Sequence, residues 1–139
     1  MNRAMAIVAA LAMASVAVSA ASVMSETARN PHNFTLKLEY LNFVNGEWSG
    51  DAEFTIAACQ APSCFRLSGK ASLPLSPSTS LNEGVFPVPR LACDLHFQEV
   101  PHNGMDSGDW RISLSNRDHG GNGCASLPAG LAGIYREVD

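Results

Sequence analysis

Apolar and polar residues alternate along most of this chain in short runs, which is the period-two pattern of half-buried β-strands. No long stretch after residue 20 shows the 3.6-residue stripe of an amphipathic helix. The runs cover residues 34–40, 48–56, 65–73, 91–97 and 110–114, and residues 131–138 can supply a closing strand. Turn-forming residues separate these runs, as expected for antiparallel strands. We therefore expect an all-β, disulfide-bonded fold, a small antiparallel barrel or sandwich of about six strands.

The first two runs predict a hairpin whose register depends on the turn that contains Asn45-Gly46. A two-residue turn would place apolar Leu38 opposite polar Glu53, so the apolar face of one strand would oppose the polar face of the other. A three-residue turn with Gly46 at a bulge instead places Leu38 opposite Ala52. The pattern therefore predicts the three-residue bulged turn.

Four segments lack a strand pattern and are interpreted as loops. Residues 22–33 are polar and form a loose lead-in, and residues 74–89 contain four prolines and form a long exposed loop. Residues 101–108 form a polar loop, and the glycine-rich residues 116–123 are expected to be mobile.

The amino-terminal segment has the features of a secretory signal peptide. Arg3 is followed by an uncharged, alanine-rich run, and small residues lie near Ala20, where a signal peptidase would cut. The apolar run is too short to span a membrane comfortably. We expect a signal peptide over residues 1–20 and a single β domain over residues 21–139, with no stable membrane anchor after cleavage. The predicted location is periplasmic or secreted.

The net charge limits the partners. The whole chain has a formal charge of −4 at pH 7, and loss of Arg3 with the signal leaves eight basic against thirteen acidic side chains. Nucleic acid is therefore not an expected partner. A basic protein, such as a lysozyme, would be attracted by this charge, although the charge also serves simple solubility.

Four cysteines in an exported chain predict two disulfides, because the compartment is oxidising. They are Cys59, Cys64, Cys93 and Cys124, and their spacing does not fit a zinc site. Cys59 and Cys64 flank a turn and both fall out of phase with the inward residues, whereas Cys93 falls in an inward row. Sequence alone leaves three connectivities open, and this phase favours Cys59 with Cys64 and Cys93 with Cys124.

Two groups of polar residues could support catalysis or metal binding, and both can also be explained as ordinary solvated surface. Asp94 and His96 share the outer face of one strand and could form an acid-base pair with a nearby serine, but no nucleophile motif accompanies them. Asp118-His119 could bind a metal together with His102 and Asp106, but the spacing is not that of a metal site. We expect no catalytic residue, no metal and no cofactor.

Arg66, Ser68 and Lys70 form a basic, hydroxyl-bearing row on the outer face of the third strand. Such a row is either a solvated strand face or a contact surface on an otherwise acidic protein. We take these three residues as the candidate binding residues. Phe86 and Val88 fall in the predicted loop, where they anchor a partner or cap the core.

Several short stretches resemble known sequences. They are Cys64-Phe65-Arg66-Leu67-Ser68-Gly69-Lys70-Ala71, Cys93-Asp94-Leu95-His96-Phe97, Cys124 and Ala132-Gly133-Ile134-Tyr135-Arg136. Their order is similar to that in small exported proteobacterial β-proteins of largely unknown function, some of which look like the periplasmic lysozyme inhibitors. In those inhibitors a Ser-Gly-x-x-Tyr loop, in some followed by a lysine, is implied to enter the lysozyme cleft. Here Ser72 stands in place of the tyrosine, so the resemblance carries over only Ser68 and Lys70.

These observations predict a non-enzymatic periplasmic binding protein, with inhibition of a lysozyme-type hydrolase as the specific candidate. The alternative is an envelope protein that binds a small molecule or ion inside a β-barrel or at its mouth. An enzyme is the third possibility. A deep cavity in the barrel, rather than a filled core, would favour the alternative.

Overall fold

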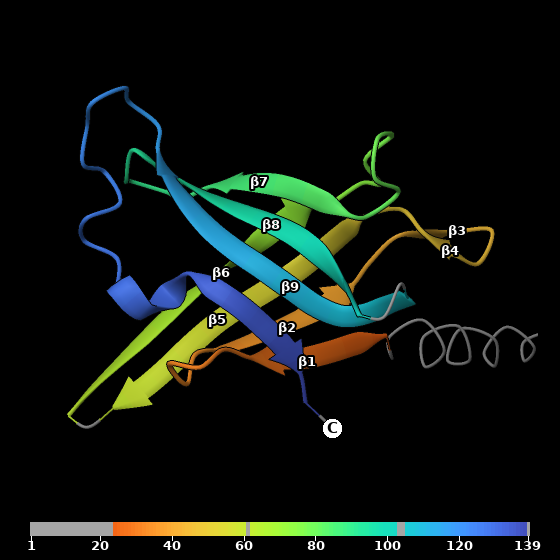
Figure 1. Ribbon diagram of the computed structural model, residues 1–139, viewed down its shortest axis with the longest axis horizontal. Coiled ribbons are helices and arrows are strands. Elements are labelled where there is room, and N and C mark those ends of the chain that lie inside the picture. The colour runs from red at the N-terminus through yellow and green to blue at the C-terminus, as the bar shows by residue number, and fades with distance from the viewer. Residues whose placement is uncertain (1–23, 61, 103–104, 139) are drawn as a thin grey trace, which may run out of the picture.

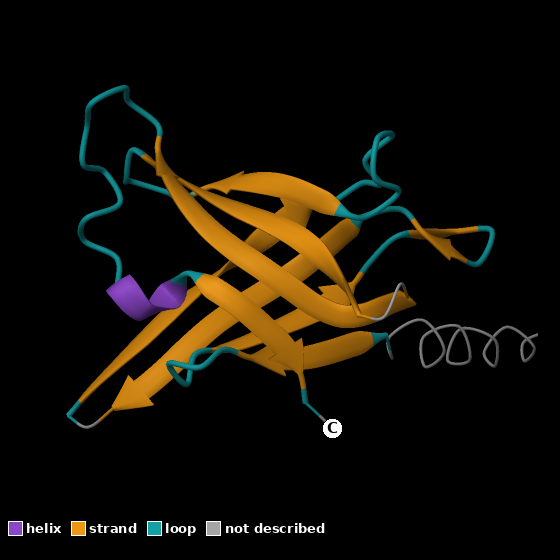
Figure 2. Cartoon of the chain, viewed as in Figure 1, coloured by secondary structure: helices purple, strands orange, loops and turns teal. Residues whose placement is uncertain are grey.

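The computed structural model describes residues 24–60, 62–102 and 105–138, and these form an all-β fold (Figures 1 and 2). Eight strands join in one antiparallel sheet with the order β6-β5-β2-β1-β10-β9-β8-β7, and a separate small hairpin pairs β3 with β4. The strands are β1 (Ser25–Arg29), β2 (Thr35–Tyr40), β3 (Phe43–Val44), β4 (Glu47–Trp48), β5 (Asp51–Gln60), β6 (Ser63–Ser72), β7 (Glu83–Pro87), β8 (Cys93–His102), β9 (Met105–Asn116) and β10 (Gly133–Glu137). The predicted signal peptide lies outside the described residues.

The sheet curls until its two end strands, β6 and β7, approach each other, so that it nearly closes as a barrel (Figure 1). Two glycines allow this approach. A Cβ atom at Gly69 of β6 would overlap the ring of Phe86, and a Cβ atom at Gly84 of β7 would overlap the backbone carbonyl of Ser72. The Asn82 side chain also donates a hydrogen bond of 2.7 Å to the Leu73 carbonyl across this junction. Of the two architectures expected from the sequence, barrel and sandwich, the structure is a nearly closed barrel.

The inward-facing rows of the strands fill the barrel with apolar side chains. Phe54 lies among them, with ring centroids 4.8 Å from Phe86 and 5.0 Å from Phe97. The largest fully buried side chains are Trp110, Tyr135, Phe54, Phe97, Leu36, Leu38, Ile56, Leu73, Leu95, Ile112, Leu131 and Cys93. Each large apolar side chain buried in this way contributes roughly 1.5–3 kcal/mol of transfer free energy. The alternation in the sequence therefore predicted the core face correctly.

The expectation of about six strands was too low, because two segments interpreted as loops are strands. Ser25–Arg29, part of the predicted lead-in, is β1 and pairs with both β2 and β10. Glu83–Pro87, within the predicted long loop, is β7 and pairs with β8. Both have weak strand signals: β1 is held by neighbours on both sides, and β7 tolerates Pro87 because it lies at the sheet edge. Phe86 and Val88 accordingly pack into the core rather than extend from a loop.

The turn prediction for the first hairpin was wrong, although the facing of its residues was right. Leu38 pairs with Phe54 rather than Ala52, so the apolar faces still match but the register is shifted by two residues. Asn45 and Gly46 form a two-residue turn, with φ angles of 53° and 81°, that closes the small β3–β4 hairpin. Both residues favour left-handed backbone, which this hairpin turn requires. The segment between β2 and β5 therefore contains a second hairpin.

The predicted polar loop over residues 101–108 was also wrong. β8 continues to His102 and β9 begins at Met105, so both strands extend into this segment, with a register shift between Val100 and Pro101. A proline in a strand is accommodated at such an irregularity because the ladder is interrupted there. The predicted closing strand is confirmed as β10, which pairs with β1 and β9.

Hydrogen bonds from Asn30 close one end of the barrel. This buried side chain accepts bonds of 3.0 and 2.9 Å from the backbone N–H groups of His32 and Phe34, and it donates to the Gly130 carbonyl at 2.7 Å. Gly130 belongs to the short 3-10 helix η2 (Ala129–Leu131), drawn in purple in Figure 2. The hydroxyl of Tyr135 donates a bond of 2.6 Å to the Leu131 carbonyl. The β1–β2 turn and η2 are thus fixed together over the core.

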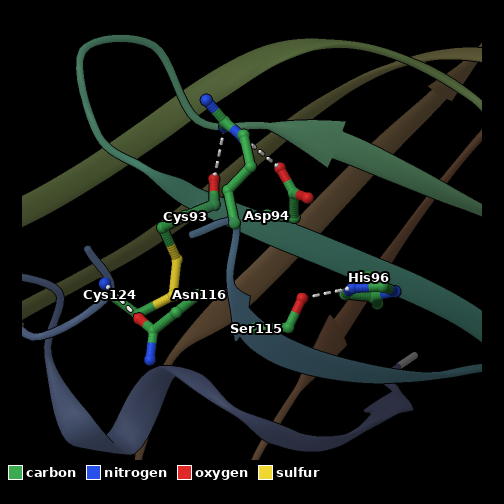
Figure 3. Close-up of a disulfide and its surroundings, with 7 residues drawn as sticks. Cys93, Asp94, His96, Ser115, Asn116 and Cys124 are labelled. Carbon is green, nitrogen blue, oxygen red and sulfur yellow. Dashed lines mark hydrogen bonds and ion pairs between the residues drawn. A yellow bond between two sulfur atoms is a disulfide. The ribbon is translucent and has the colours of Figure 1, made fainter. Parts of the chain in front are cut away.

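The favoured disulfide connectivity is confirmed. Cys59 and Cys64 are directly opposite each other on β5 and β6, with a Cα separation of 4.0 Å, and both are exposed. Cys93 is fully buried at the start of β8 and is bonded to Cys124 in the segment after β9 (Figure 3). The first bond fixes a local hairpin, and the second connects distant parts of the chain.

Removal of the two disulfides should destabilise the protein unequally. On the chain-entropy argument, the Cys93→Ala/Cys124→Ala pair should lower the free energy of unfolding by about 4 kcal/mol, because that bond spans 31 residues. The Cys59→Ala/Cys64→Ala pair spans 5 residues and should cost about 2 kcal/mol. Urea unfolding of the oxidised parent and the two variants measures both values. A larger loss from the Cys59–Cys64 pair would contradict this argument.

Candidate functional site

The predicted binding residues Arg66, Ser68 and Lys70 all lie exposed on the outer face of β6. Their cross-strand neighbours on β5 are Ala57, Thr55 and Glu53. The prediction that the row faces outward is therefore confirmed. No ion pair is formed by Arg66 or Lys70 with any other residue in the described part of the chain. Both cations are available to a partner.

The row begins next to the disulfide-bonded end of the β5–β6 hairpin. A shallow cavity of about 370 Å³ lies there, lined by Asn33, Thr35, Ala57, Ala58, Cys59, Cys64, Phe65 and Arg66. Most of these side chains lie on the outer surface of the barrel wall, and few of them are large and apolar. Its volume is at the low end of the roughly 300–1,000 Å³ of common ligand pockets.

A much larger cavity, of about 980 Å³, lies where β2, β5 and β6 end near the small β3–β4 hairpin; we call it the mouth cavity. Its lining combines apolar and polar side chains. It is formed by Met24, Tyr40, Leu41, Asn42, Phe43, Gly46, Asp51, Ala52, Lys70, Ala71 and Ser72. A largely apolar concave surface with a few polar groups is typical of small-molecule sites.

Small residues occupy the level of the inward rows that borders the mouth cavity. Ala52 pairs directly with Ala71, and Ala52 also pairs with Tyr40 on its other side. Elsewhere these inward rows hold larger residues such as Phe54 and Ile56, which fill the barrel. Both alanines line the mouth cavity but are almost fully buried, so the cavity touches them only at its edge.

The rim of the mouth cavity is held by aromatic and polar contacts. The rings of Tyr40 and Trp48 lie 4.4 Å apart between centroids. The Trp48 indole donates a hydrogen bond of 2.6 Å to the Asp51 carbonyl, and the Asn42 amide donates one of 3.0 Å to the Asp51 carboxylate. These bonds fix the β3–β4 hairpin relative to β5, so the rim is preorganised.

Tyr40 also connects the cavity to a polar group inside the barrel. Its pKa is raised well above the ordinary value, chiefly by burial and then by its hydrogen bond to Glu26 and the charges of Glu26, Glu99 and Glu137. The Trp110 indole donates a second bond, of 3.0 Å, to Glu26. Glu26 is thus satisfied by two ring donors, which explains how an inward-facing carboxylate is tolerated in β1.

The two polar residues considered for catalysis do not contact each other. His96 Nε2 lies 2.8 Å from the Ser115 hydroxyl, whereas the Asp94 carboxylate accepts a bond of 2.9 Å from Arg117 (Figure 3). Arg117 also donates a hydrogen bond to the Cys93 carbonyl. Asp94 therefore helps to hold together the end of the β8–β9 pair. Neither of the two cavities is lined by these residues. The geometry brings His96 to a serine but not to Asp94, so these residues do not form a complete Asp-His-Ser triad.

The metal hypothesis involved Asp118, His119, His102 and Asp106. The side chains of His102 and Asp106 lie outside the described part of the structure. Within the part that is described, no group of three or more His, Cys, Asp or Glu side chains is arranged to hold a metal ion.

Sequence reasoning found the exposed row but missed the mouth cavity. Two alanines, Ala52 and Ala71, border the cavity at inward positions of neighbouring strands, but most of its lining comes from other residues. Finding the cavity required the cross-strand register and the position of the β3–β4 hairpin, which the alternation of residues does not give.

Comparisons with protein families, curated proteins and solved structures found no match for this chain. Similarity to lysozyme inhibitors therefore stays an expectation from short motifs. The two disulfides indicate an oxidising compartment. Among the helices of the described residues, none is long and apolar enough to cross a membrane.

The tyrosines of the folded protein should not ionise near pH 10 in an alkaline titration. The chain has two, and burial raises the pKa of Tyr135 as well as that of Tyr40 well above the ordinary value of about 10. Because the folded state retains protons that the unfolded state loses above pH 10, stability should fall as pH rises beyond that value. Tyrosinate absorbance should therefore appear together with unfolding measured by far-UV circular dichroism. A normal titration near pH 10 in the folded protein would contradict this assignment.

Proposed function

We propose that this protein is an exported, non-enzymatic binding protein whose ligand site is the mouth cavity. The observation that carries the proposal is a cavity of about 980 Å³ at one end of a barrel whose interior is otherwise filled. A packed core stabilises the fold, whereas an unfilled, partly apolar mouth costs buried contacts and is useful when a ligand supplies them.

The lining defines the class of ligand. Tyr40, Phe43 and Leu41 offer surface to an aromatic or aliphatic body, and Met24 at the rim is 50% exposed. Lys70 is a cation at the same cavity, and Asp51 is already hydrogen-bonded to Asn42. The best fit is a small amphipathic molecule with an anionic group that faces Lys70.

Two naphthalene dyes test this assignment. Anionic 1-anilinonaphthalene-8-sulfonate and neutral N-phenyl-1-naphthylamine should both bind, with increased dye emission and a change in Trp48 fluorescence. Lys70→Gln should lower the affinity for the anionic dye by about tenfold and leave the affinity for the neutral dye nearly unchanged, because only the anionic dye interacts with the charge of Lys70. Binding is measured by fluorescence titration.

A larger side chain placed at the cavity tests the site, and the same substitution elsewhere is the matched control. Ala71→Leu places a larger side chain at the mouth cavity and should weaken both dyes, whereas Ala125→Leu makes the same change at an exposed site away from it. Equal binding to both variants, with both folded by circular dichroism, would rule out the mouth cavity as the site.

Inhibition of a lysozyme-type hydrolase is the second candidate. It is supported by the exposed row Arg66, Ser68 and Lys70 next to a hairpin end fixed by the Cys59–Cys64 disulfide. A rigid surface loses little entropy on binding, and the acidic chain would attract a basic hydrolase. Against this, the row lies along a barrel wall rather than on a loop that could enter a cleft.

A turbidity assay with lysozymes of several classes tests the inhibitor candidate. If it is correct, the purified protein at micromolar excess should slow the lysis of bacterial cells, and Ser68→Ala/Lys70→Ala should relieve the inhibition. Unchanged lysis with every lysozyme would exclude this candidate and leave the dye-binding proposal unaffected.

A further inference from the structure

β6 lies at the end of the sheet and has a strand partner on one side, β5. On its other side β7 approaches at Gly69 and Ser72, through the ring of Phe86 and the backbone of Gly84. No backbone hydrogen bond joins β6 to β7 in the described part of the chain. Towards the disulfide, the β5–β6 hairpin extends away from β7 (Figure 1). The stretch from Cys64 to Ser68 is therefore an open strand edge.

The register shows which backbone groups face this edge. In an antiparallel pair, alternate residues direct both their N–H and C=O groups to the partner strand, and the residues between them direct both groups away. The Leu73 N–H donates a bond of 2.7 Å to the Gly50 carbonyl in the continuation of the β5–β6 ladder. Counting back from Leu73 in steps of two, residues 71, 69, 67 and 65 also face β5. The main-chain groups of the residues between them, Arg66, Ser68 and Lys70, therefore point away from β5.

The side chains around this edge favour an acidic partner. Arg66 and Lys70 are exposed cations that form no ion pair within the described residues. The inward-facing Phe65 and Leu67 are only half-buried, although they belong to the apolar row of β6. An added strand with acidic residues on one face and apolar residues on the other would pair with the cations and cover the half-buried row.

We propose that the open edge of β6 from Cys64 to Ser68, with the Lys70 side chain beside it, binds an extended acidic segment of a partner protein as an added β-strand. Main-chain hydrogen bonds to Arg66 and Ser68 provide the attachment, and the side-chain charges select the partner. A second copy of this chain is disfavoured, since antiparallel pairing centred on Ser68 would place Arg66 opposite Lys70. The main-chain groups of Arg66 and Ser68 lie outside the mouth cavity, and only Lys70 borders both sites.

The test uses two fluorescent octapeptides with blocked ends, one alternating glutamate with valine and one alternating lysine with valine. Anisotropy titrations at low ionic strength should show binding of the glutamate peptide at least about tenfold tighter than that of the lysine peptide. Equal affinities, or no binding of either peptide, would overturn the proposal. Absence of binding would mean that the cations keep the edge from pairing.

Two substitutions locate the binding to β6. Arg66→Glu should lower the affinity for the glutamate peptide by about tenfold. Lys37→Glu is the matched control, because it makes the same charge change at an exposed position of β2, two strands from the edge, and should change affinity less than about twofold. Equal losses from both variants would show a general charge effect and overturn the proposal. Neither residue lines the mouth cavity, so dye binding reports on that site independently.

Ser68→Pro tests the main-chain bonds. It removes an N–H group that faces the open side and keeps the bonds to β5, so the variant should fold and lose peptide binding. If it does not fold, the parent is titrated with a glutamate peptide that carries N-methyl groups on alternate residues, which should bind at least about tenfold more weakly. Unchanged binding in either experiment would overturn the proposal. So would a dimer of the parent, measured by sedimentation, that Ser68→Pro dissociates.

Discussion

The junction between β6 and β7 determines the shape of the whole barrel. These strands end the sheet, and they meet through the close approach of Phe86 to Gly69 and of Gly84 to the Ser72 backbone, without a hydrogen-bonded ladder. A closed barrel removes the exposed edges of a sheet, whereas a barrel whose end strands meet over only part of their length leaves some of them. A larger residue at Gly84 would collide with the Ser72 backbone and separate the strands, and one at Gly69 would require the Phe86 ring to move.

The two ends of the barrel differ as a consequence of what fills them. At one end, Asn30 and Tyr135 fix the β1–β2 turn and η2 over the core with buried hydrogen bonds. At the other end, the mouth cavity opens next to Ala52 and Ala71, and its rim is held by Trp48. Polar groups with hydrogen-bond partners close the first end. The second end is bordered by the strand ends and the β3–β4 hairpin, and this is where the candidate ligand site lies.

The sequence was sufficient for the features that depend on local alternation. The inward rows, the exposed Arg66, Ser68 and Lys70, and the phase of the cysteines all follow from period-two patterning, which neighbouring residues determine. The patterns failed where long-range pairing decides the structure. The polar segment Ser25–Arg29 becomes a strand because β2 and β10 supply its hydrogen bonds, and Asn45-Gly46 closes a hairpin that the longer pattern concealed. The mouth cavity and the open edge of β6 likewise depend on register and sheet order.

Both candidate binding surfaces meet on β6 for a physical reason. Lys70 lines the mouth cavity and also ends the open edge, because β6 runs from the disulfide-bonded turn to the rim. A strand at the end of a sheet has backbone and side-chain groups that an internal strand uses for its neighbours. The Cys59–Cys64 disulfide holds the far end of β6 against β5, so the edge keeps its extended form without a second neighbour. A partner would therefore bind a strand that is already ordered, at a reduced entropic cost.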